Sequence, residues 1–524
     1  MKGGIVVGNV GVLVYGGVIG VGERVCVYLM LLQCLDNVLP APFYEGVSHN
    51  INISAVAGSG KTTVLLELLK FIPDDKQALF VAFNNSIVDE LKNRIGVKPN
   101  VEISTIHSYG WRSILCRYGS KVKMNPNKAF SKIEGVLKQH EVSAKKHGYY
   151  YYIIPKVIDL MRCNLCEAKK EDVLELSIHY DIDISEVEAE IIIEVFNKMN
   201  KDKSQFDFMD MIYQPIVDNH VKLRKYDYVF CDESQDFSVC QQEVVKRSLN
   251  RRGRLITVGD ERQAIYGFAG ADADSYNKLS ELNGYSVKLP LSICYRCSKS
   301  VVIEAQEIVP EITYAPDAPM GIVREGSLRD DLKSGDWILC RNLKPLIQTY
   351  LWLMKNKIKS KIKGKDIGEG ILGMISKTGA KTLRGMWTLL ELQQEKLFKK
   401  LQKRGVKQPS LHPKMELFNQ RLEVIECLIN EVNNVEELKR LIENIFTDDI
   451  KGIMLSTIHK SKGLENDRIL FLLPELLPSR YATTEWMLEQ ERNLWYVAVT
   501  RAKHSLIYIM NNEFRKDLQT QITI

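Results

Sequence analysis

Residues 52–69 read NISAVAGSGKTTVLLELL, and the rest of the chain is arranged around this stretch. An apolar run is followed by a glycine-rich turn over Ala55–Gly60 and then by leucines at helical spacing, which predicts a strand, a loop and a helix. In such a loop the backbone N–H groups and the helix N-terminus face phosphate oxygens. Lys61 would reach the β- and γ-phosphates, and the Thr62 hydroxyl would ligate Mg²⁺. We therefore predict a nucleoside triphosphate site, although Ala55 stands where the usual motif has glycine; a glycine turn without a ligand is the alternative.

Length and composition indicate a soluble, multidomain globular protein. At 524 residues the chain is too long for one hydrophobic core, so we expect two to four domains. The net charge of +6, from 71 basic and 65 acidic residues, allows a local basic groove but does not by itself indicate nucleic acid. The eleven cysteines form no secretory framework, which predicts an intracellular protein of the cytoplasm or nucleus, or of the host cell if the chain is viral.

Two C-x-x-C pairs could be read as halves of a zinc site, namely Cys163 with Cys166 and Cys294 with Cys297. A structural zinc ion needs four ligands, and neither pair has a second pair close to it in the sequence. Cys163 and Cys166 also stand one turn apart in what we predict to be a single helix. We expect ordinary thiols at both pairs.

The first 50 residues have an unusual composition. Gly3 to Gly22 contain no charge and about eight glycines, and a second apolar run follows at Val25–Leu35. This many glycines lowers helix propensity and hydrophobicity together, which argues against a membrane span. A signal peptide would need a basic start and a cleavage site. We expect an atypical N-terminal extension over residues 1–50 and no membrane partner; a membrane anchor is the alternative.

Alternation of strand and helix patterns predicts a parallel sheet in the first half of the chain. Leu79–Phe83 read as a buried strand followed by a helix, and Val101–Gly110 read as a strand that runs into a polar turn. The segment KYDYVFCDESQDFS then places Asp232 and Glu233 at the carboxyl end of a strand, where ligands bind in open α/β sheets. Asp232 could hold Mg²⁺, and Glu233 could orient or deprotonate an attacking water. A solvated acidic turn is the alternative.

The segment RLITVGDERQAIYGFAGAD predicts another strand, followed by a loop that exposes Gln263, Tyr266 and Phe268. A polar side chain beside two aromatic ones suits a loop that contacts a phosphate on one side and a base on the other. A second α/β unit begins near Tyr285. Lysine-rich helical segments interrupt both units, and their basic clusters are either solvated faces or phosphate contacts.

Eight segments resemble, in the right order, the motifs of superfamily 1 DNA helicases of the UvrD/Rep/PcrA type, especially the compact UvrD-like helicases of phages. They are AVAGSGKT, VAFNNSIVDEL, STIHSYG, DESQD, VGDERQAIYGFAGAD, YRC, STIHKSKGLE and ERNLWYVAVTRAK, between about Ile51 and Met510. The resemblance implies a P-loop NTPase of α/β class, with two RecA-like parallel-sheet domains and helical insertions. The expected parts are a first RecA-like domain (51–112 and 226–284), a helical insertion (113–225), a second RecA-like domain (285–362 and 451–524) and a reduced helical insertion (363–450).

The resemblance also implies ATP and Mg²⁺ as cofactors, with Thr62 and Asp232 as metal ligands. The loop residues around the phosphates are Ala55, Val56, Ala57, Gly58, Ser59, Gly60, Lys61, Thr62 and Thr63. Gln263 matches the glutamine that couples the γ-phosphate to the DNA groove. The remaining nucleotide contacts implied by the family are Arg296 and Arg501 on transition-state charge, Tyr295 on the adenine and Glu465 near the ribose. Those implied for nucleic acid are Phe83, Asn85, His107, Tyr266, Phe268 and His459.

The chain departs from the family pattern at four places. The adenine-reading glutamine of the family has no equivalent, since its position falls near Pro40. Phe268 and Ala269 replace a tryptophan and an arginine, and Asn466 stands where an aromatic residue is common. The insertion at 363–450 is shorter than in UvrD.

These features predict an ATP-dependent DNA helicase that moves on single-stranded DNA from 3′ to 5′ and unwinds tailed duplexes in replication, recombination or repair. One alternative is an ATP-gated protein that binds single-stranded nucleic acid with weak or no unwinding, because the adenine reader is missing. Another is a motor that moves on RNA or in the 5′ to 3′ direction.

Overall fold

The protein is described by a computed structural model. It describes residues 50–82, 87–89, 91–92, 98–142, 144–180, 182, 184–267, 270–272, 274–282, 286–402, 409–411, 413–447, 452–482 and 484–519. Residues 1–49 of the predicted N-terminal extension lie outside the described residues, whereas Asn50 begins the first strand of the sheet. Of the predicted nucleic-acid residues, Phe83, Asn85 and Phe268 lie outside them as well.

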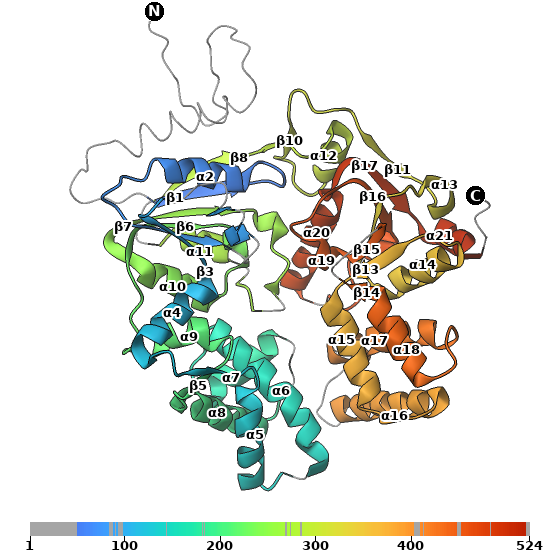
Figure 1. Cartoon of the computed structure of the whole chain (residues 1–524), viewed down its shortest axis with the longest axis horizontal. Helices are drawn as coiled ribbons and strands as arrows, with labels where there is room; N and C mark the ends of the chain where they lie inside the picture. The colour runs from blue at the N-terminus through green and yellow to red at the C-terminus, as the bar shows by residue number, and fades with distance from the viewer. Residues whose placement is uncertain are drawn as a thin grey trace, which may run out of the picture. The chain divides into compact units, whose positions relative to one another are not determined.

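A six-stranded, fully parallel sheet forms the first core (Figure 1). Its strands, in spatial order, are β3 (Val101–Thr105), β2 (Ala78–Ala82), β6 (Tyr226–Cys231), β7 (Leu249–Gly259), β1 (Asn50–Ala55) and β8 (Ser286–Leu291). The sequence ALFVA of β2 is buried along its whole length, the pattern of a parallel strand covered on both faces. The connecting helices are α2 (Lys61–Lys70), α4 (Ile106–Tyr118), α10 (Val239–Ser248) and α11 (Ser275–Ser280).

Strand β8 belongs to the first sheet. We expected the second RecA-like domain to begin at residue 285, but Ser286–Leu291 pair with β1 in parallel over six residues. β8 is an edge strand whose residues alternate between half-buried and exposed over most of its length. It leads directly into β9 (Ile293–Cys294), which pairs with β10 (Thr313–Tyr314) in a separate small sheet. The chain therefore runs from β8, which pairs with the strand before the nucleotide loop, directly into the segment that carries Tyr295 and Arg296.

A helical unit interrupts the first sheet between α4 and β6. Its helices are α5 (Lys128–Gln139), α6 (Ala144–Cys163), α7 (Lys170–His179), α8 (Glu186–Lys201) and α9 (Asp210–Val217), with a two-stranded sheet of β4 (Lys123–Met124) and β5 (Gln205–Phe206). A capping box of Ser185 and Glu188 starts α8, whose apolar face is buried in the core. Helix α6 ends at Cys163, and Leu165 has a positive φ of 51°, so Cys166 lies beyond the helix. Our prediction of one helix for both cysteines is wrong because this left-handed residue ends the helical path.

A second fully parallel sheet of seven strands lies in the C-terminal half. Its order is β11 (Ile322–Glu325), β17 (Ala502–Ile509), β16 (Asn466–Leu472), β12 (Trp337–Cys340), β15 (Ile453–Thr457), β13 (Ser360–Lys363) and β14 (Phe446–Thr447). Its helices are α12 (Lys299–Ala305), α13 (Leu328–Asp331), α14 (Leu343–Lys355), α19 (Ile458–Ser461), α20 (Glu485–Val499) and α21 (Asn511–Gln519). Two parallel sheets with helical connections confirm the predicted α/β class with two RecA-like domains.

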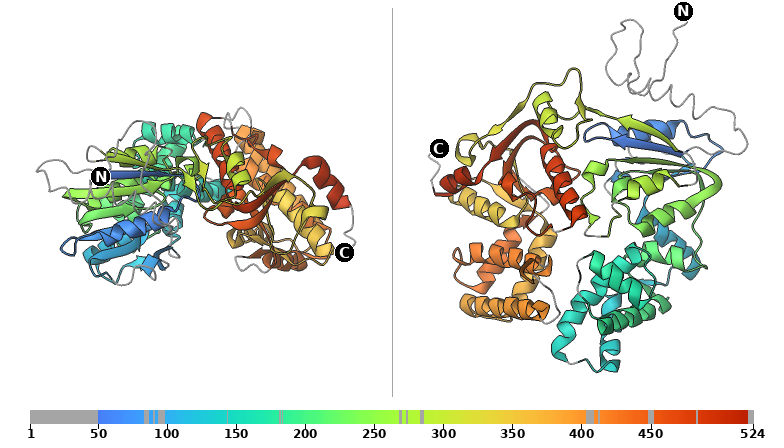
Figure 2. Two further views of the ribbon diagram at one scale, coloured as in Figure 1. Left: turned by 90° about the horizontal axis from the view of Figure 1, so that it is seen from above. Right: turned by 180° about the vertical axis from the view of Figure 1, so that it is seen from behind.

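Four helices are inserted between β13 and β14, and Figure 2 shows them from two further sides. They are α15 (Lys365–Ser376), α16 (Leu383–Gln402), α17 (Pro413–Ile429) and α18 (Val435–Ile445). Their apolar faces share one core with the second sheet. Among the helices of the described residues, none is long and apolar enough to cross a membrane.

Candidate nucleotide and nucleic-acid site

The glycine-rich loop joins β1 to α2 and folds back on itself. Gly58 and Gly60 have φ values of +70° and +85°, a region that glycine enters without steric cost. The Ser59 hydroxyl donates to the Val56 carbonyl oxygen at 2.8 Å, which closes the turn. Lys61 begins α2, and its side chain is only 8% exposed. The loop thus places a helix N-terminus and a buried lysine at the same point.

Two strand ends bring carboxylates to this lysine and to the neighbouring Thr62. Lys61 Nζ lies 4.0 Å from Glu233 Oε2, just after β6, and 3.8 Å from Asp260 Oδ2, just after β7. Thr62 Oγ1 donates to Asp232 Oδ2 at 3.5 Å. Glu233 has a φ of +51°, a strained value for a residue with a side chain. Since parallel strands end at one edge of a sheet, residues far apart in the chain meet here.

Burial and nearby charges drive the pKa values of the two neighbouring carboxyls apart. Burial, with the negative charge of Glu233, raises the pKa of Asp232 to about 7. Burial also opposes ionisation of Glu233, but the charges of Lys61 and Lys462 outweigh it and lower its pKa to about 2. A hydroxyl and a carboxylate at hydrogen-bond distance form the oxygen donor set that Mg²⁺ prefers. Thr62 and Asp232 therefore fit a magnesium ion.

Gln263, in the 3₁₀ turn η2 (Glu261–Gln263), connects the carboxylate cluster to the C-terminal half. Its amide nitrogen donates to Asp260 Oδ2 at 2.6 Å, and its amide oxygen accepts from Arg501 Nη2 at 3.4 Å. Arg501 follows α20 and is buried, with Nε bound to the Val497 carbonyl oxygen at 3.0 Å. Desolvation by burial, together with the charge of Arg296, lowers the pKa of Arg501 to about 10, which still leaves it charged at neutral pH.

The structure pairs two residues that we predicted for different roles. Arg296 Nε lies 2.5 Å from Glu465 Oε2, so the proposed transition-state arginine and the proposed ribose contact form an ion pair. Lys503 Nζ also lies 3.0 Å from Glu465 Oε1. Tyr295 is 40% exposed, and its backbone N–H donates to the Gly58 carbonyl oxygen at 3.0 Å. The segment from β9 to α12 is therefore seated directly on the nucleotide loop.

The predicted nucleic-acid residue His107 lies on a helix rather than in a polar turn. The strand ends at Thr105, whose hydroxyl accepts from the Ser108 N–H and starts α4. The His107 ring stacks on Phe208 with centroids 4.1 Å apart and planes 22° from parallel. Phe208 is 58% exposed. Burial lowers the pKa of His107 to about 4, so the stacked ring is neutral at physiological pH.

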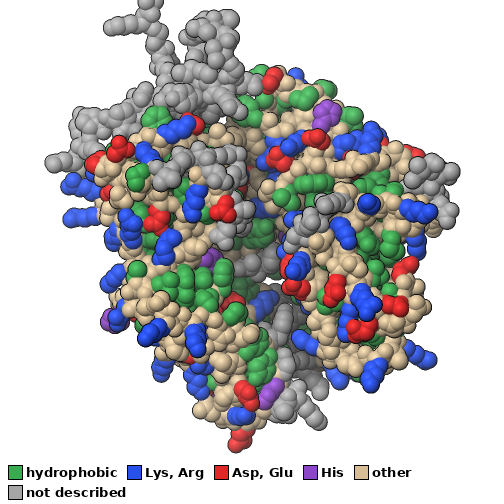
Figure 3. Space-filling model, viewed as in Figure 1, with side chains coloured by type: hydrophobic (Ala, Val, Ile, Leu, Met, Phe, Trp, Pro, Cys, Tyr) green, Lys and Arg blue, Asp and Glu red, His purple; other side chains and the backbone are tan. Residues whose placement is uncertain are grey.

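The other described nucleic-acid candidates are half-buried. Tyr266 lies under the ammonium group of Lys462, 4.8 Å from its ring centroid, and burial raises its pKa to about 12. Burial lowers the pKa of His459 to about 3, with a contribution from the positive charge of Arg341. Figure 3 shows lysine and arginine side chains scattered over the visible face instead of gathered in one patch. Neutral, stackable rings are thus the feature these positions share.

Two family models match this chain in succession. Residues 42–283 match the UvrD/REP helicase N-terminal domain, and residues 290–513 match the UvrD-like helicase C-terminal domain. The chain belongs to the UvrD/Rep/PcrA-type superfamily 1 helicases. The resemblance we drew from the eight motifs is confirmed.

Relatives of this UvrD-type chain include eukaryotic and bacterial proteins. F-box DNA helicase protein 1 of Schizosaccharomyces pombe is 26% identical over 521 residues, covering 87% of this chain and 55% of the relative. F-box DNA helicase 1 of Gallus gallus is 22% identical, covering 87% and 47%. ATP-dependent DNA helicase PcrA of Bacillus subtilis is 28% identical over 281 residues, covering 49% and 37%. The chain spans about half the length of the F-box helicases it matches.

Sequence reasoning missed four residues of this UvrD-type site. Tyr496 OH accepts from the Ala57 N–H at 2.9 Å and donates to Asp260 Oδ2 at 3.4 Å. Lys462 Nζ donates to Asp236 Oδ2 and to the Gln263 carbonyl oxygen. The others are Gln235, which bridges Glu233 and the Asp260 N–H, and the exposed Phe208. Three of these residues lie within the motifs quoted above, namely Tyr496, Lys462 and Gln235. We missed them because we assigned roles to other residues of the same motifs.

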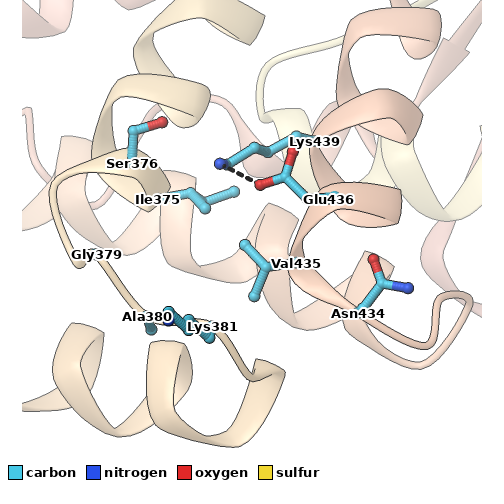
Figure 4. A pocket seen from close by; sticks show the side chains of 9 residues that line it. All are labelled: Ile375, Ser376, Gly379, Ala380, Lys381, Asn434, Val435, Glu436 and Lys439. Carbon is cyan, nitrogen blue, oxygen red and sulfur yellow. Dashed lines mark hydrogen bonds and ion pairs between the residues drawn. The ribbon is translucent and has the colours of Figure 1, made fainter.

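A pocket of about 460 Å³ lies away from these motifs, in the helical insertion of the second sheet (Figure 4). It is bounded by the C-terminal end of α15, the loop residues 379–381 that follow it and the start of α18. Lys439 Nζ donates to Glu436 Oε1 at 2.7 Å on its wall. The Lys439 ammonium group and the Glu436 carboxylate thus pair with each other. None of the predicted site residues lines this pocket.

Proposed function

We propose that this chain is an ATP-dependent DNA helicase that translocates on single-stranded DNA from 3′ to 5′ and unwinds tailed duplexes. The observation that carries the proposal is the continuous network from Lys61 through Asp260 and Gln263 to Arg501, which joins the nucleotide loop to the C-terminal half. The relatives reported above are all named as DNA helicases, which supports the choice of DNA. Replication, recombination and repair are the processes in which such a motor would serve.

The site residues divide the work of ATP hydrolysis among them. Thr62 and Asp232 would hold Mg²⁺, which when bound neutralises phosphate charge and polarises the phosphoryl oxygens. Lys61 binds the β- and γ-phosphates in place of the carboxylates it now faces. Glu233, whose pKa is lowered to about 2, is ionised at neutral pH and accepts a proton from the attacking water.

Arg296 must exchange its ion-pair partner before it can act on the γ-phosphate. Arg296 is bound to Glu465 here, so its role on the γ-phosphate requires that it exchange this carboxylate for phosphate. Arg501 is already held in place by the Val497 and Leu464 carbonyl oxygens. An arginine that stabilises the charge of the transition state raises the rate of hydrolysis by about 10³- to 10⁵-fold.

Coupling between hydrolysis and DNA grip would run through one loop. Gln263 contacts Asp260 beside Lys61, and Tyr266 follows three residues later. Lys462 binds the Gln263 carbonyl oxygen and lies over the Tyr266 ring. A shift at the γ-phosphate would therefore move a ring that can stack on a base, an interaction that tolerates any sequence. Closure of such a site around its substrate and reopening after the reaction can set the order of steps in an enzymatic cycle.

The test is steady-state ATP hydrolysis by the purified chain, with and without single-stranded DNA, together with unwinding of duplexes that carry a 3′ or a 5′ tail. Lys61→Ala should abolish hydrolysis because it removes the buried cation of the loop. Lys70→Ala is the matched control, since Lys70 lies on the same helix, exposed and paired to Glu67. Unwinding only from the 5′ tail would overturn the polarity. DNA binding without hydrolysis by the unmodified chain would favour the ATP-gated binding protein, as expected if the missing adenine-reading glutamine matters.

A further inference from the structure

Cys294 and Cys297 flank Tyr295 and Arg296, the two residues of this segment that we predict to contact the nucleotide. Both cysteines are buried, at 0% and 3% exposure. The Cys297 N–H donates to Cys294 Sγ at 3.4 Å. The Cys294 sulfur therefore lies against the backbone of Cys297, across the turn between β9 and α12.

The pair touches the proposed catalytic apparatus on two sides. A Cβ atom placed on Gly58 of the nucleotide loop would lie 2.9 Å from Cys294 Sγ and 2.5 Å from Arg296 Cβ, so this contact has no spare room. On the other side, Cys297 Sγ lies 3.8 Å from the carbonyl oxygen of Thr500, the residue before Arg501. A change at either sulfur is thus transmitted to the nucleotide loop or to one of the two arginines.

The environment of the pair also favours thiol chemistry. The hydrogen bond from the Cys297 thiol, with backbone N–H groups and the charge of Arg296, lowers the pKa of Cys294 to about 7. Thiols with a pKa near the ambient pH attack disulfides best. The chain's other C-x-x-C pair differs, because burial raises the pKa of Cys163 to about 12 and that of Cys166 to about 11.

We propose that Cys294 and Cys297 form a reversible disulfide that switches off ATP hydrolysis. The inference rests on the proposed function, since the switch acts through Tyr295 and Arg296. The oxidant is a low-molecular-weight disulfide. The Cys294 thiolate attacks one of its sulfurs, forming a mixed disulfide and releasing one small thiol; the Cys297 thiolate then attacks Cys294 Sγ, closing the Cys294–Cys297 bond and releasing the second. The two cysteines lose two protons and two electrons in total, and the small disulfide is reduced.

Closing this bond shifts the backbone between the sulfurs. Tyr295 and Arg296 make up all of that backbone, and both are pressed against Gly58. Since a misplacement of about 1 Å can cost roughly 10²-fold in rate, we expect at least about a tenfold loss of hydrolysis. The oxidant reaches the buried sulfurs when the contact between Tyr295 N–H and the Gly58 carbonyl opens.

The experiment treats the folded full chain with glutathione disulfide and follows three readouts: the mass of the peptide that contains both cysteines, ATP hydrolysis, and binding of a fluorescent ATP analogue. We expect the peptide to lose two hydrogens, hydrolysis and analogue affinity each to fall at least about tenfold, and dithiothreitol to restore them. Cys294→Ser should keep its activity under the oxidant, whereas Cys297→Ser should stop at the mixed disulfide and gain the mass of one small thiol. Cys163→Ser, the matched control, should be as sensitive as the unmodified chain.

Three results would overturn the inference: no disulfide in the folded chain, the disulfide present with hydrolysis and analogue binding unchanged, or equal inhibition of Cys294→Ser and the unmodified chain. The last would show that the attacking sulfur is dispensable. A reduced chain without hydrolysis would instead count against the proposed function. In that case peptide mass and analogue binding, which need no turnover, still decide the fate of the disulfide.

Discussion

At the scale of single residues, Gly58 is a position of close contact between the nucleotide loop and the segment with Tyr295 and Arg296. Its φ is +70°, and a Cβ atom at this position would lie 2.5 Å from Arg296 Cβ, which leaves no place for a side chain. We expect Gly58→Ala to push away the segment with Tyr295 and Arg296 and to lower ATP hydrolysis at least about tenfold. Steady-state hydrolysis at saturating ATP measures this.

Gly135 supplies the control for that substitution. It lies in the interior of α5, and a Cβ there meets open space. Gly135→Ala should leave hydrolysis unchanged and stabilise the fold by up to about 1 kcal/mol, because alanine has the higher helix propensity. If both alanine variants hydrolyse ATP at the unmodified rate, the close approach at Gly58 has no catalytic importance.

His107 makes the stability of the fold depend on pH. Burial lowers its pKa from 6.5 to about 4, so the unfolded chain binds a proton at this site before the folded chain does. Stability is therefore complete above pH 6.5 and is lost as the pH falls towards 4. Between pH 6.5 and 5.5 we expect a loss of roughly 1 kcal/mol from this residue.

Urea unfolding at several pH values tests this expectation. His107→Gln should flatten the profile between pH 6.5 and 5.5, whereas His220→Gln, at an exposed position, should reproduce the unmodified profile. A profile that His107→Gln does not change would mean that the ring is protonated equally in the folded and unfolded chains.

At the scale of elements, the turn that presents Phe208 is held by a buried charge cluster. Asp207 and Asp210 each accept the other's backbone N–H, at 2.8 and 3.0 Å. Arg162 of α6 donates to both oxygens of Asp207, and Lys128 of α5 lies 2.7 Å from Asp210. Three helices thus fix one exposed aromatic ring, in a cluster where almost every charge has a partner.

Removing one charge from this cluster should be costly. Arg162→Ala leaves the buried carboxylates of Asp207 and Asp210 with too little positive charge. We expect the free energy of unfolding, measured with urea, to fall by about 3–5 kcal/mol. Lys170→Ala, which removes the exposed ion pair to Glu186, should cost less than about 1 kcal/mol. Comparable losses in the two variants would show that the buried cluster does not hold the turn.

At the scale of the whole molecule, Lys462 links the C-terminal half to the first sheet. It is 8% exposed and binds Asp236, whose pKa burial raises to about 6, and the Gln263 carbonyl oxygen. We expect Lys462→Ala to lower ATP hydrolysis at least about tenfold, because it releases the loop that carries Gln263 and Tyr266.

The neighbouring Lys460 is a close control for this link. It lies on α19, two residues before Lys462, but is 41% exposed and pairs with Asp366 in the helical insertion. Lys460→Ala should change hydrolysis by less than about twofold, as expected for a surface ion pair. Equal effects of the two substitutions would remove Lys462 from the coupling route.

Local patterns were sufficient to predict the elements of the site. The loop Ala55–Gly60, the carboxylates after β6 and the polar loop after β7 all lie where strand and helix periodicity placed them, because these signals depend on near neighbours in the chain. His107 was expected in a turn and lies on a helix, since the Thr105 cap acts through a hydrogen bond that periodicity does not reveal.

By itself, the sequence determined the α/β class, the family and the identity of most residues at the strand ends, because motifs and burial patterns are local. Tertiary structure alone decided which of them meet: that β8 joins the first sheet, that Arg296 pairs with Glu465, and that Tyr496 reaches Ala57. These contacts join residues separated by up to 439 positions. Such pairings depend on how parallel strands and their crossovers pack, and no short-range pattern encodes them.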